Sequence, residues 1–165
     1  MKIGIMYYSR TGNTRQAAKI LEEKFKEKKS SVDLIEIEHV SRPGFFTAGR
    51  AASKQEELPM KNTDFDLGKY DVIIVGSPTW AGKPSPFIIS FMNKAENIRG
   101  KKMAVFSTGM SPIDKRDQFL EIIKNVFKNT GIGSVGALLA LNYKRGRLAN
   151  GQQNIDTFVK NCLEG

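Results

Sequence analysis

The segment IGIMYYSRTGNTR, residues 3–15, joins a short apolar run to a loop of hydroxyl, glycine and arginine residues. The run itself, residues 3–8, has the near-continuous hydrophobicity of a strand buried on both faces of a parallel sheet. Apolar residues then recur at helical spacing over residues 13–29, as at Ala17 and Leu21. The segment is therefore predicted to form a buried strand, a loop and the start of a helix.

The same alternation of strand and helix continues along the chain. Further apolar runs of strand length lie at residues 32–40, 72–75, 103–106 and 135–141. Helical patterns lie at residues 46–57, 84–96, 114–128 and 152–163. The second run alternates apolar and charged residues, which is typical of an edge strand. Five strands alternating with helices predict one α/β domain over residues 1–165, with a three-layer, doubly wound, five-stranded parallel sheet.

Composition limits the classes of protein to which the chain can belong. Its 165 residues are 40% hydrophobic, enough for a real core. The single Cys162 excludes an internal disulfide framework, and with His39 the only histidine no metal site is predicted. No apolar run reaches the ~20 residues of a membrane span, and the first residues do not resemble a signal peptide. We therefore expect a cytoplasmic protein.

The first loop has the composition of a phosphate site. Hydroxyl groups come from Ser9, Thr11 and Thr14, and Gly12 lets the backbone approach a ligand closely. A phosphate here would meet the free N–H groups and the positive dipole end of the following helix. No lysine follows the glycine, and GxGxxG is absent, which disfavours both nucleoside triphosphate hydrolysis and ordinary dinucleotide binding. The alternative is that Asn13 or Thr14 only caps the helix.

Two further loops follow the third and fourth predicted strands. Residues 77–84 read SPTWAGKP and contain Trp80, the only tryptophan, which can either stack on a flat ligand or pack in the core. Residues 107–112 read STGMSP and offer backbone donors and a thioether. Because ligands of doubly wound folds bind beyond the carboxyl ends of the strands, the three loops predict a site for a mononucleotide with a flat ring.

Taken together, these three motifs resemble the phosphate loop and the two flavin loops of the flavodoxin family. The resemblance spans essentially the whole chain and implies a flavodoxin-like fold with sheet order 2-1-3-4-5 and non-covalently bound FMN. It implies that the phosphate is held by Ser9, Thr11, Gly12, Asn13 and Thr14. The flavin would be lined by Ser77, Pro78 and Thr79, stacked on Trp80 and flanked by Ser107, Thr108, Gly109 and Met110. Arg10, Ala81 and Gly82 complete the expected cofactor-binding set.

The function then has two main candidates. One is an electron carrier that docks to a redox partner, and the other is an NAD(P)H-dependent FMN-containing reductase of quinones, nitro compounds or flavins. The net charge of +9 predicts that a docking partner presents an acidic face. A third, remote candidate is a nucleic-acid-binding module, which the charge permits but for which no recognition motif is present. The sequence slightly favours the carrier.

Some residues are expected to have structural roles only. Phe45 and Phe46, in the long segment 41–69, are expected to pack in the core rather than to cover a second ligand. His39 and Cys162 are expected to pack or to meet solvent, and no catalytic acid or base is predicted, because the flavin itself carries redox chemistry. Neither the electron donor nor the oligomeric state follows from the sequence.

Overall fold

The structure, a computed structural model, describes residues 1–110, 117–128 and 130–164. Its centre is a parallel sheet of five long strands, which confirms the predicted α/β fold. In chain order they are β1 (Lys2–Tyr7), β2 (Ser31–Glu36), β3 (Val72–Trp80), β5 (Lys102–Gly109) and β6 (Ser134–Lys144). Their order across the sheet is β2-β1-β3-β5-β6, the predicted order 2-1-3-4-5, and β2 lies at the edge as expected.

Two short antiparallel strands extend this sheet. β4 (Lys83–Pro84) folds back on β3, and β7 (Arg147–Asn150) folds back on β6. Both tight turns contain two successive residues with positive φ, namely Ala81 and Gly82 in one and Arg145 and Gly146 in the other. This is the geometry of type I′ hairpin turns. The prediction missed both hairpins because neither turn has the Asn-Gly or Asp-Gly sequence that marks such turns most strongly.

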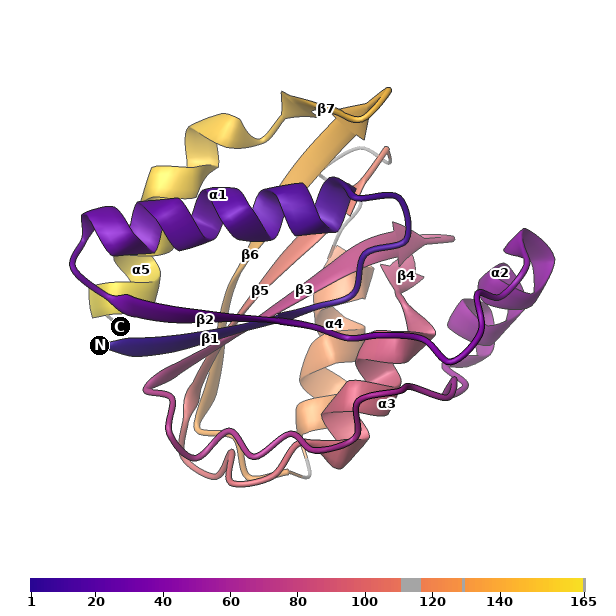
Figure 1. The fold of residues 1–165 in the computed structure, drawn as a ribbon, viewed down its shortest axis with the longest axis horizontal. Coiled ribbons are helices and arrows are strands. Elements are labelled where there is room, and N and C mark those ends of the chain that lie inside the picture. The colour runs from indigo at the N-terminus through magenta and orange to yellow at the C-terminus, as the bar shows by residue number, and fades with distance from the viewer. Residues whose placement is uncertain (111–116, 129, 165) are drawn as a thin grey trace.

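Two helices cover each face of the sheet (Figure 1). On one face, α1 (Asn13–Glu27) and α5 (Ile155–Glu164) bury Phe25 and Phe158 against β1, β3, β5 and β6. On the other face, α3 (Pro86–Lys94) and α4 (Asp117–Phe127) bury Phe91 and Phe119 in a second core. A single 3₁₀ turn, η2 (Gln152–Asn154), precedes α5, so the predicted last helix begins later than expected. The predicted start of the fourth helix, residues 114–116, lies outside the described residues.

The predicted second strand ends early, because the chain leaves the sheet after Glu36. The two ends of the following segment meet at His39 and Met60, which form an isolated β-bridge. The Val40 N–H also donates to the Pro59 carbonyl at 3.2 Å. Residues 40–59 are thus an excursion that is closed at its base. Its helix, α2 (Phe45–Lys54), buries Ala48, Ala51 and Ala52, and it lies at the periphery of the molecule beside α3 (Figure 1).

The expectation that Phe45 and Phe46 pack in the core is wrong. Their side chains are 80% and 96% exposed, because the buried face of α2 consists of alanines and the two rings stand at the helix start. In the described part of the chain, no helix has the length and apolar character needed to cross a membrane.

Candidate functional site

The structure brings the three predicted loops together at the carboxyl ends of β1, β3 and β5. Strand pairing places Ser77 beside Ser107 and Pro78 beside Thr108, which joins the second loop to the third. The hydroxyl oxygens of Thr14 and Thr108 lie 2.8 Å apart and join the first loop to the third. The Tyr8 N–H donates to the Gly76 carbonyl at 3.1 Å, so the first and second loops are adjacent as well.

The first loop ends at Gly12, whose φ of +94° turns the chain directly into α1. A Cβ at Gly12 would meet no atom within 4 Å, so the backbone here borders open space. The N-cap residue is Gly12, which has no side chain to cap the helix, so the alternative that Asn13 or Thr14 serves only as a cap is not what the structure shows. Thr11 is exposed, whereas the buried Ser9 hydroxyl accepts a hydrogen bond from the Arg15 N–H at 3.2 Å. A helix start at a glycine that carries no capping side chain is a favourable place for a phosphate.

The second loop is the β3–β4 hairpin. Ser77 is fully buried, and its hydroxyl donates to the Pro78 carbonyl at 2.8 Å and accepts from the Ser85 N–H at 2.9 Å. This hydroxyl therefore fixes the hairpin against the start of α3. The Thr79 hydroxyl is buried without a hydrogen-bond partner in the described residues. Trp80, at the end of β3, is half-buried and packs edge-on against Tyr8 at 5.8 Å between ring centroids.

The third loop closes the other side of the site. Ser107 and Thr108 are buried at the end of β5, and Gly109 is half-buried. Met110 follows and is 86% exposed, so its thioether is free to contact a bound ligand. The last two residues of the predicted motif, Ser111 and Pro112, lie outside the described residues.

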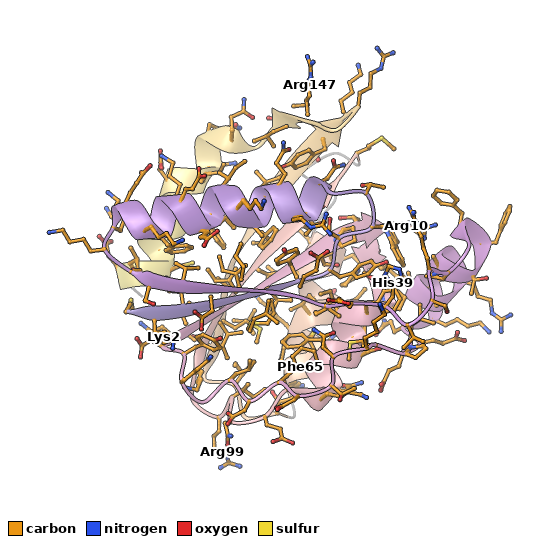
Figure 2. The ribbon with its side chains drawn as sticks, viewed as in Figure 1. Lys2, Arg10, His39, Phe65, Arg99 and Arg147 are labelled. Carbon is orange, nitrogen blue, oxygen red and sulfur yellow. The ribbon has the colours of Figure 1, made fainter. Side chains whose placement is uncertain are left out.

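The Arg10 side chain lies close to two aromatic rings. Its guanidinium carbon is 4.4 Å from the centre of the Phe45 ring and 5.5 Å from that of Trp80. Arg42 donates from Nη2 to the Arg10 carbonyl at 3.4 Å, so α2 and its approach are tied to the first loop. Figure 2 shows Arg10 and His39 on the side of the molecule that faces α2. No sequence pattern pairs Arg10 with Phe45, because their contact depends on how the excursion folds back.

A pocket of about 330 Å³ lies beside the first loop, between it and the end of β2. It is lined by Ser9, Arg10, Arg15, Glu36, Ile37, Glu38, His39 and Lys61. Its carboxylates are already paired: Glu36 accepts from Arg15 at 2.6 and 2.8 Å, and Glu38 lies 3.7 Å from Lys61. The His39 ring packs edge-on against Tyr8 at 5.9 Å. The sequence did not place His39 at the site, because it was predicted at the end of the second strand, far in sequence from the three loops.

Two tyrosines at the end of β1 remain protonated at neutral pH. Burial, followed by the charge of Glu36, raises the pKa of Tyr7 to about 12. Burial also raises the pKa of Tyr8, although the positive charges of Arg10 and Arg42 oppose it. The Tyr8 hydroxyl is therefore available as a hydrogen-bond donor at neutral pH.

Several buried polar atoms around this site have no hydrogen-bond partner within the described part of the chain. They are the Tyr8 hydroxyl, Nε and Nη1 of Arg10, and the Thr79 hydroxyl. Native proteins rarely leave such groups unsatisfied, so their concentration here indicates a polar ligand. Together with the open helix start and the neighbouring indole, they fit a ligand that combines a phosphate with a flat, polar ring.

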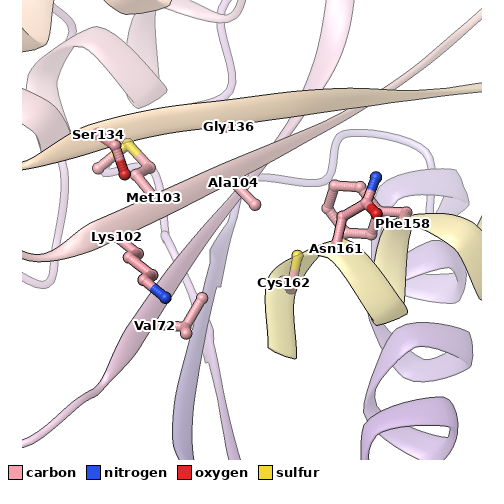
Figure 3. A pocket seen from close by; sticks show the side chains of 9 residues that line it. All are labelled: Val72, Lys102, Met103, Ala104, Ser134, Gly136, Phe158, Asn161 and Cys162. Atoms are coloured by element: carbon pink, nitrogen blue, oxygen red, sulfur yellow. The ribbon is translucent and has the colours of Figure 1, made fainter. Parts of the chain in front are cut away.

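A second pocket, of about 210 Å³, lies at the opposite ends of the strands (Figure 3). It is formed between α5 and the amino ends of β3, β5 and β6, and none of its lining residues belongs to the three loops. Cys162 lines it, but burial raises the pKa of this thiol to about 12, so it is neutral at physiological pH. Among the described residues, no three potential metal ligands cluster.

Comparison with known proteins agrees with this geometry. The NADPH-dependent FMN reductase family matches residues 1–137. A relative named NAD(P)H dehydrogenase (quinone), from Caulobacter vibrioides strain NA1000 / CB15N, is 30% identical over 97 residues, which are 59% of this chain and 48% of that protein. The chain thus spans about half the length of the curated relatives it matches.

Solved structures share the fold over nearly their whole length. Flavodoxin 2 from Bacillus cereus is 25% identical, with 99% of each chain covered and a TM-score of 0.67. Flavodoxin 1 from the same organism is 19% identical, with 99% of this chain and 96% of that one covered and a TM-score of 0.61. A flavoprotein in complex with FMN from Lactobacillus acidophilus NCFM is 20% identical, with 95% and 97% covered and a TM-score of 0.62.

Proposed function

The chain belongs to the NADPH-dependent FMN reductase family, and from this premise we propose that it is an NAD(P)H-dependent reductase of small flat electron acceptors. It has a flavodoxin-like fold, and its cofactor is FMN. When bound, FMN accepts electrons from one substrate and passes them to another. The acceptor classes proposed are quinones, nitro compounds and free flavins.

The three loops supply the proposed cofactor site. The backbone of residues 9–14 and the hydroxyls of Ser9, Thr11 and Thr14 would hold the phosphate at the start of α1. Residues 77–82 would line the ring, with Trp80 beside it, and residues 107–110 would flank the opposite side. Ser77 contributes through its backbone, because its hydroxyl is engaged with Pro78 and Ser85.

The overall reaction needs no catalytic acid or base from the chain. With a quinone as acceptor, NADPH loses two electrons and one proton, and the quinone gains two electrons and two protons. The second proton comes from water, which reaches an open site directly. What the protein contributes is the orientation of the cofactor and of the two substrates.

The observation that carries this proposal is the exposed apolar rim of the site. Phe45, Phe46 and Met110 are each at least 80% exposed. Met110 ends the third loop, and the Phe45 ring lies 4.4 Å from the guanidinium carbon of Arg10 in the first loop. Phe45 and Phe46 are adjacent residues of α2, and adjacent large exposed apolar side chains mark interaction sites on soluble proteins. A rim of this kind gives a second flat molecule a surface against which to pack.

A second candidate, an electron carrier, is favoured by a different observation. The tip of the β6–β7 hairpin presents Lys144, Arg145 and Arg147, all exposed, at the same end of the sheet as the three loops. Figure 2 shows Arg147 projecting from this tip. Such a tip suits a redox partner with an acidic docking face.

Anaerobic mixing of the FMN-loaded protein with NADPH separates the two candidates. A reductase loses its flavin absorbance within seconds of mixing and regains it when a quinone such as menadione is added. A carrier keeps its oxidised spectrum for minutes with NADPH alone. An Arg147→Gln variant serves as a control, because the hairpin tip matters for partner docking and not for reduction by NADPH.

A further inference from the structure

Arg10 is held in place at the site, but its hydrogen-bonding capacity is not used. Its guanidinium lies against the Phe45 ring at 4.4 Å and near the Trp80 ring at 5.5 Å. Nε and Nη1 are buried and have no hydrogen-bond partner in the described residues. Cation–π contact compensates only part of the lost hydration of a guanidinium, so the two donors still favour an acceptor.

The charges around Arg10 leave it without a counter-ion in the described part of the chain. The two carboxylates that share its pocket are engaged elsewhere, Glu36 with Arg15 at 2.6 Å and Glu38 with Lys61 at 3.7 Å. Arg42 brings a second positive charge close to Arg10, because its guanidinium donates to the Arg10 carbonyl. The local charge is therefore positive, and an anion is the ligand that would neutralise it.

The surroundings of this charge are flat and apolar. The guanidinium lies near the rings of both Phe45 and Trp80, and Phe46 is next along α2. Phe45 is 80% exposed, so a rotation of its side chain costs little buried surface and would move one of the two neighbouring rings away from the guanidinium. An aromatic molecule with one acidic substituent matches both the rings and the charge.

We propose that Arg10 selects flat aromatic electron acceptors that carry a carboxylate or a sulfonate, and that its guanidinium binds this acidic group. The inference rests on the proposed reductase function and names the class of its acceptor. Arg10 would act as a specificity-determining residue: it holds the substituent of the acceptor and does not take part in electron transfer.

Two matched acceptors test this preference. The FMN-loaded protein is assayed with NADPH and either 4-nitrobenzoate or its neutral methyl ester. We expect Arg10→Gln to lower kcat/KM for 4-nitrobenzoate about tenfold or more relative to kcat/KM for the ester, the effect of losing one charge-assisted hydrogen bond to the acidic group. Arg50→Gln, at an exposed position of α2, is the matched charge control and should leave both values unchanged.

A binding measurement keeps the test independent of turnover. Trp80 is the only tryptophan, so quenching of its fluorescence by either nitro compound reports binding at this site. We expect 4-nitrobenzoate to bind the FMN-loaded protein more tightly than the ester, and Arg10→Gln to abolish the difference. If NADPH reduces nothing but this preference is present, the proposed reductase function fails and the role of Arg10 stands.

Three results would overturn the inference. The first is equal binding of the acid and the ester by the unchanged protein. The second is an Arg10→Gln variant with an unaltered preference. The third is an Arg10→Gln variant that loses the preference only because it no longer retains FMN, which would assign the side chain to the cofactor. If Arg10→Gln does not fold, Arg10→Lys serves in its place: it keeps the charge without the planar fork and should retain only part of the preference.

Discussion

Single glycines decide how closely the strands and side chains near the site can approach one another. A Cβ at Gly76, within β3, would lie 2.1 Å from the ring of Phe106, which is itself fully buried. We expect Gly76→Ala to lower the free energy of unfolding by about 1–3 kcal/mol, the usual cost of overpacking a core. Urea denaturation measures this.

The control for Gly76 is Gly49, in the middle of α2, where an added Cβ meets nothing within 4 Å. Gly49→Ala should raise stability by up to about 1 kcal/mol through helix propensity. Equal stability of the two variants would contradict the close approach at Gly76.

Two threonines of the first loop are predicted to differ in role. Thr11 is exposed, whereas Thr14 is buried and shares a hydrogen bond with Thr108. We expect Thr11→Val to weaken FMN binding about tenfold and to leave stability within about 0.5 kcal/mol, because only a bond to the phosphate is lost. Thr14→Val should also lower the stability of the FMN-free protein by about 1 kcal/mol.

Calorimetric titration of FMN into the apo-protein, with urea denaturation of the same samples, checks both threonines. Full retention of FMN affinity in Thr11→Val would exclude its hydroxyl as a phosphate donor.

At the residue scale, the location of residues within one short motif could be predicted from the sequence. Contacts between residues that are remote in the sequence could not. Thr14 and Gly12 belong to one short loop whose residue types indicate a phosphate site, and the structure places them at the start of α1. By contrast, the stack of Arg10 on Phe45 and the exposure of Phe46 depend on how residues 40–59 fold back. Hydrophobicity alone predicted burial for these rings, because it does not record which face of a short helix meets the core.

At the scale of elements, the β3–β4 turn positions Trp80. Ala81 and Gly82 have φ of 49° and 78°, a region that disfavours residues with a Cβ. We expect Gly82→Ala to destabilise the protein by about 1–2 kcal/mol, and Ala81→Gly to be neutral or stabilising. Thermal denaturation measures both.

The control for this turn is Gly44→Ala, at an ordinary φ of −60° and with open space around the Cβ position. It should change stability by no more than about 0.5 kcal/mol. A similar loss in Gly44→Ala and Gly82→Ala would show that the hairpin conformation is not responsible.

The long elements were predictable because each has a clear hydrophobic period. β1, β3 and β5 are largely buried, near-continuous apolar runs, β6 is buried over residues 139–141, and α1 repeats its buried residues every three or four positions. β4 and β7 have only two and four residues, too few to show a period, and their pairing comes from the turns that precede them. The early end of β2 was hidden because residues 37–40 continue its apolar alternation after the chain has left the sheet.

At the scale of the whole molecule, three buried acidic groups make stability sensitive to alkaline pH. Burial raises the pKa of Tyr143 and of Cys162 to about 12, and burial with the charge of Glu36 raises that of Tyr7 to about 12. The unfolded chain releases these protons first, from about pH 9 for the thiol and pH 10 for the phenols. Because the folded state then binds more protons, stability is full below pH 9 and falls as pH rises towards 12.

Urea midpoints measured across this range test the alkaline effect. The expected result is a steady fall above about pH 9, and Tyr143→Phe should reduce its steepness because one of the three groups is removed. A midpoint independent of pH in this range would contradict the burial of these groups.

The closed base of the excursion over residues 40–59 has a consequence for how such proteins diverge. The His39–Met60 bridge joins the two ends of the excursion, and the excursion contributes no strand to the main sheet. Insertions, deletions or exchanges there leave the register of every long strand untouched. Residues 40–59 can therefore change in sequence or length during evolution while the three loops that form the cofactor site stay the same.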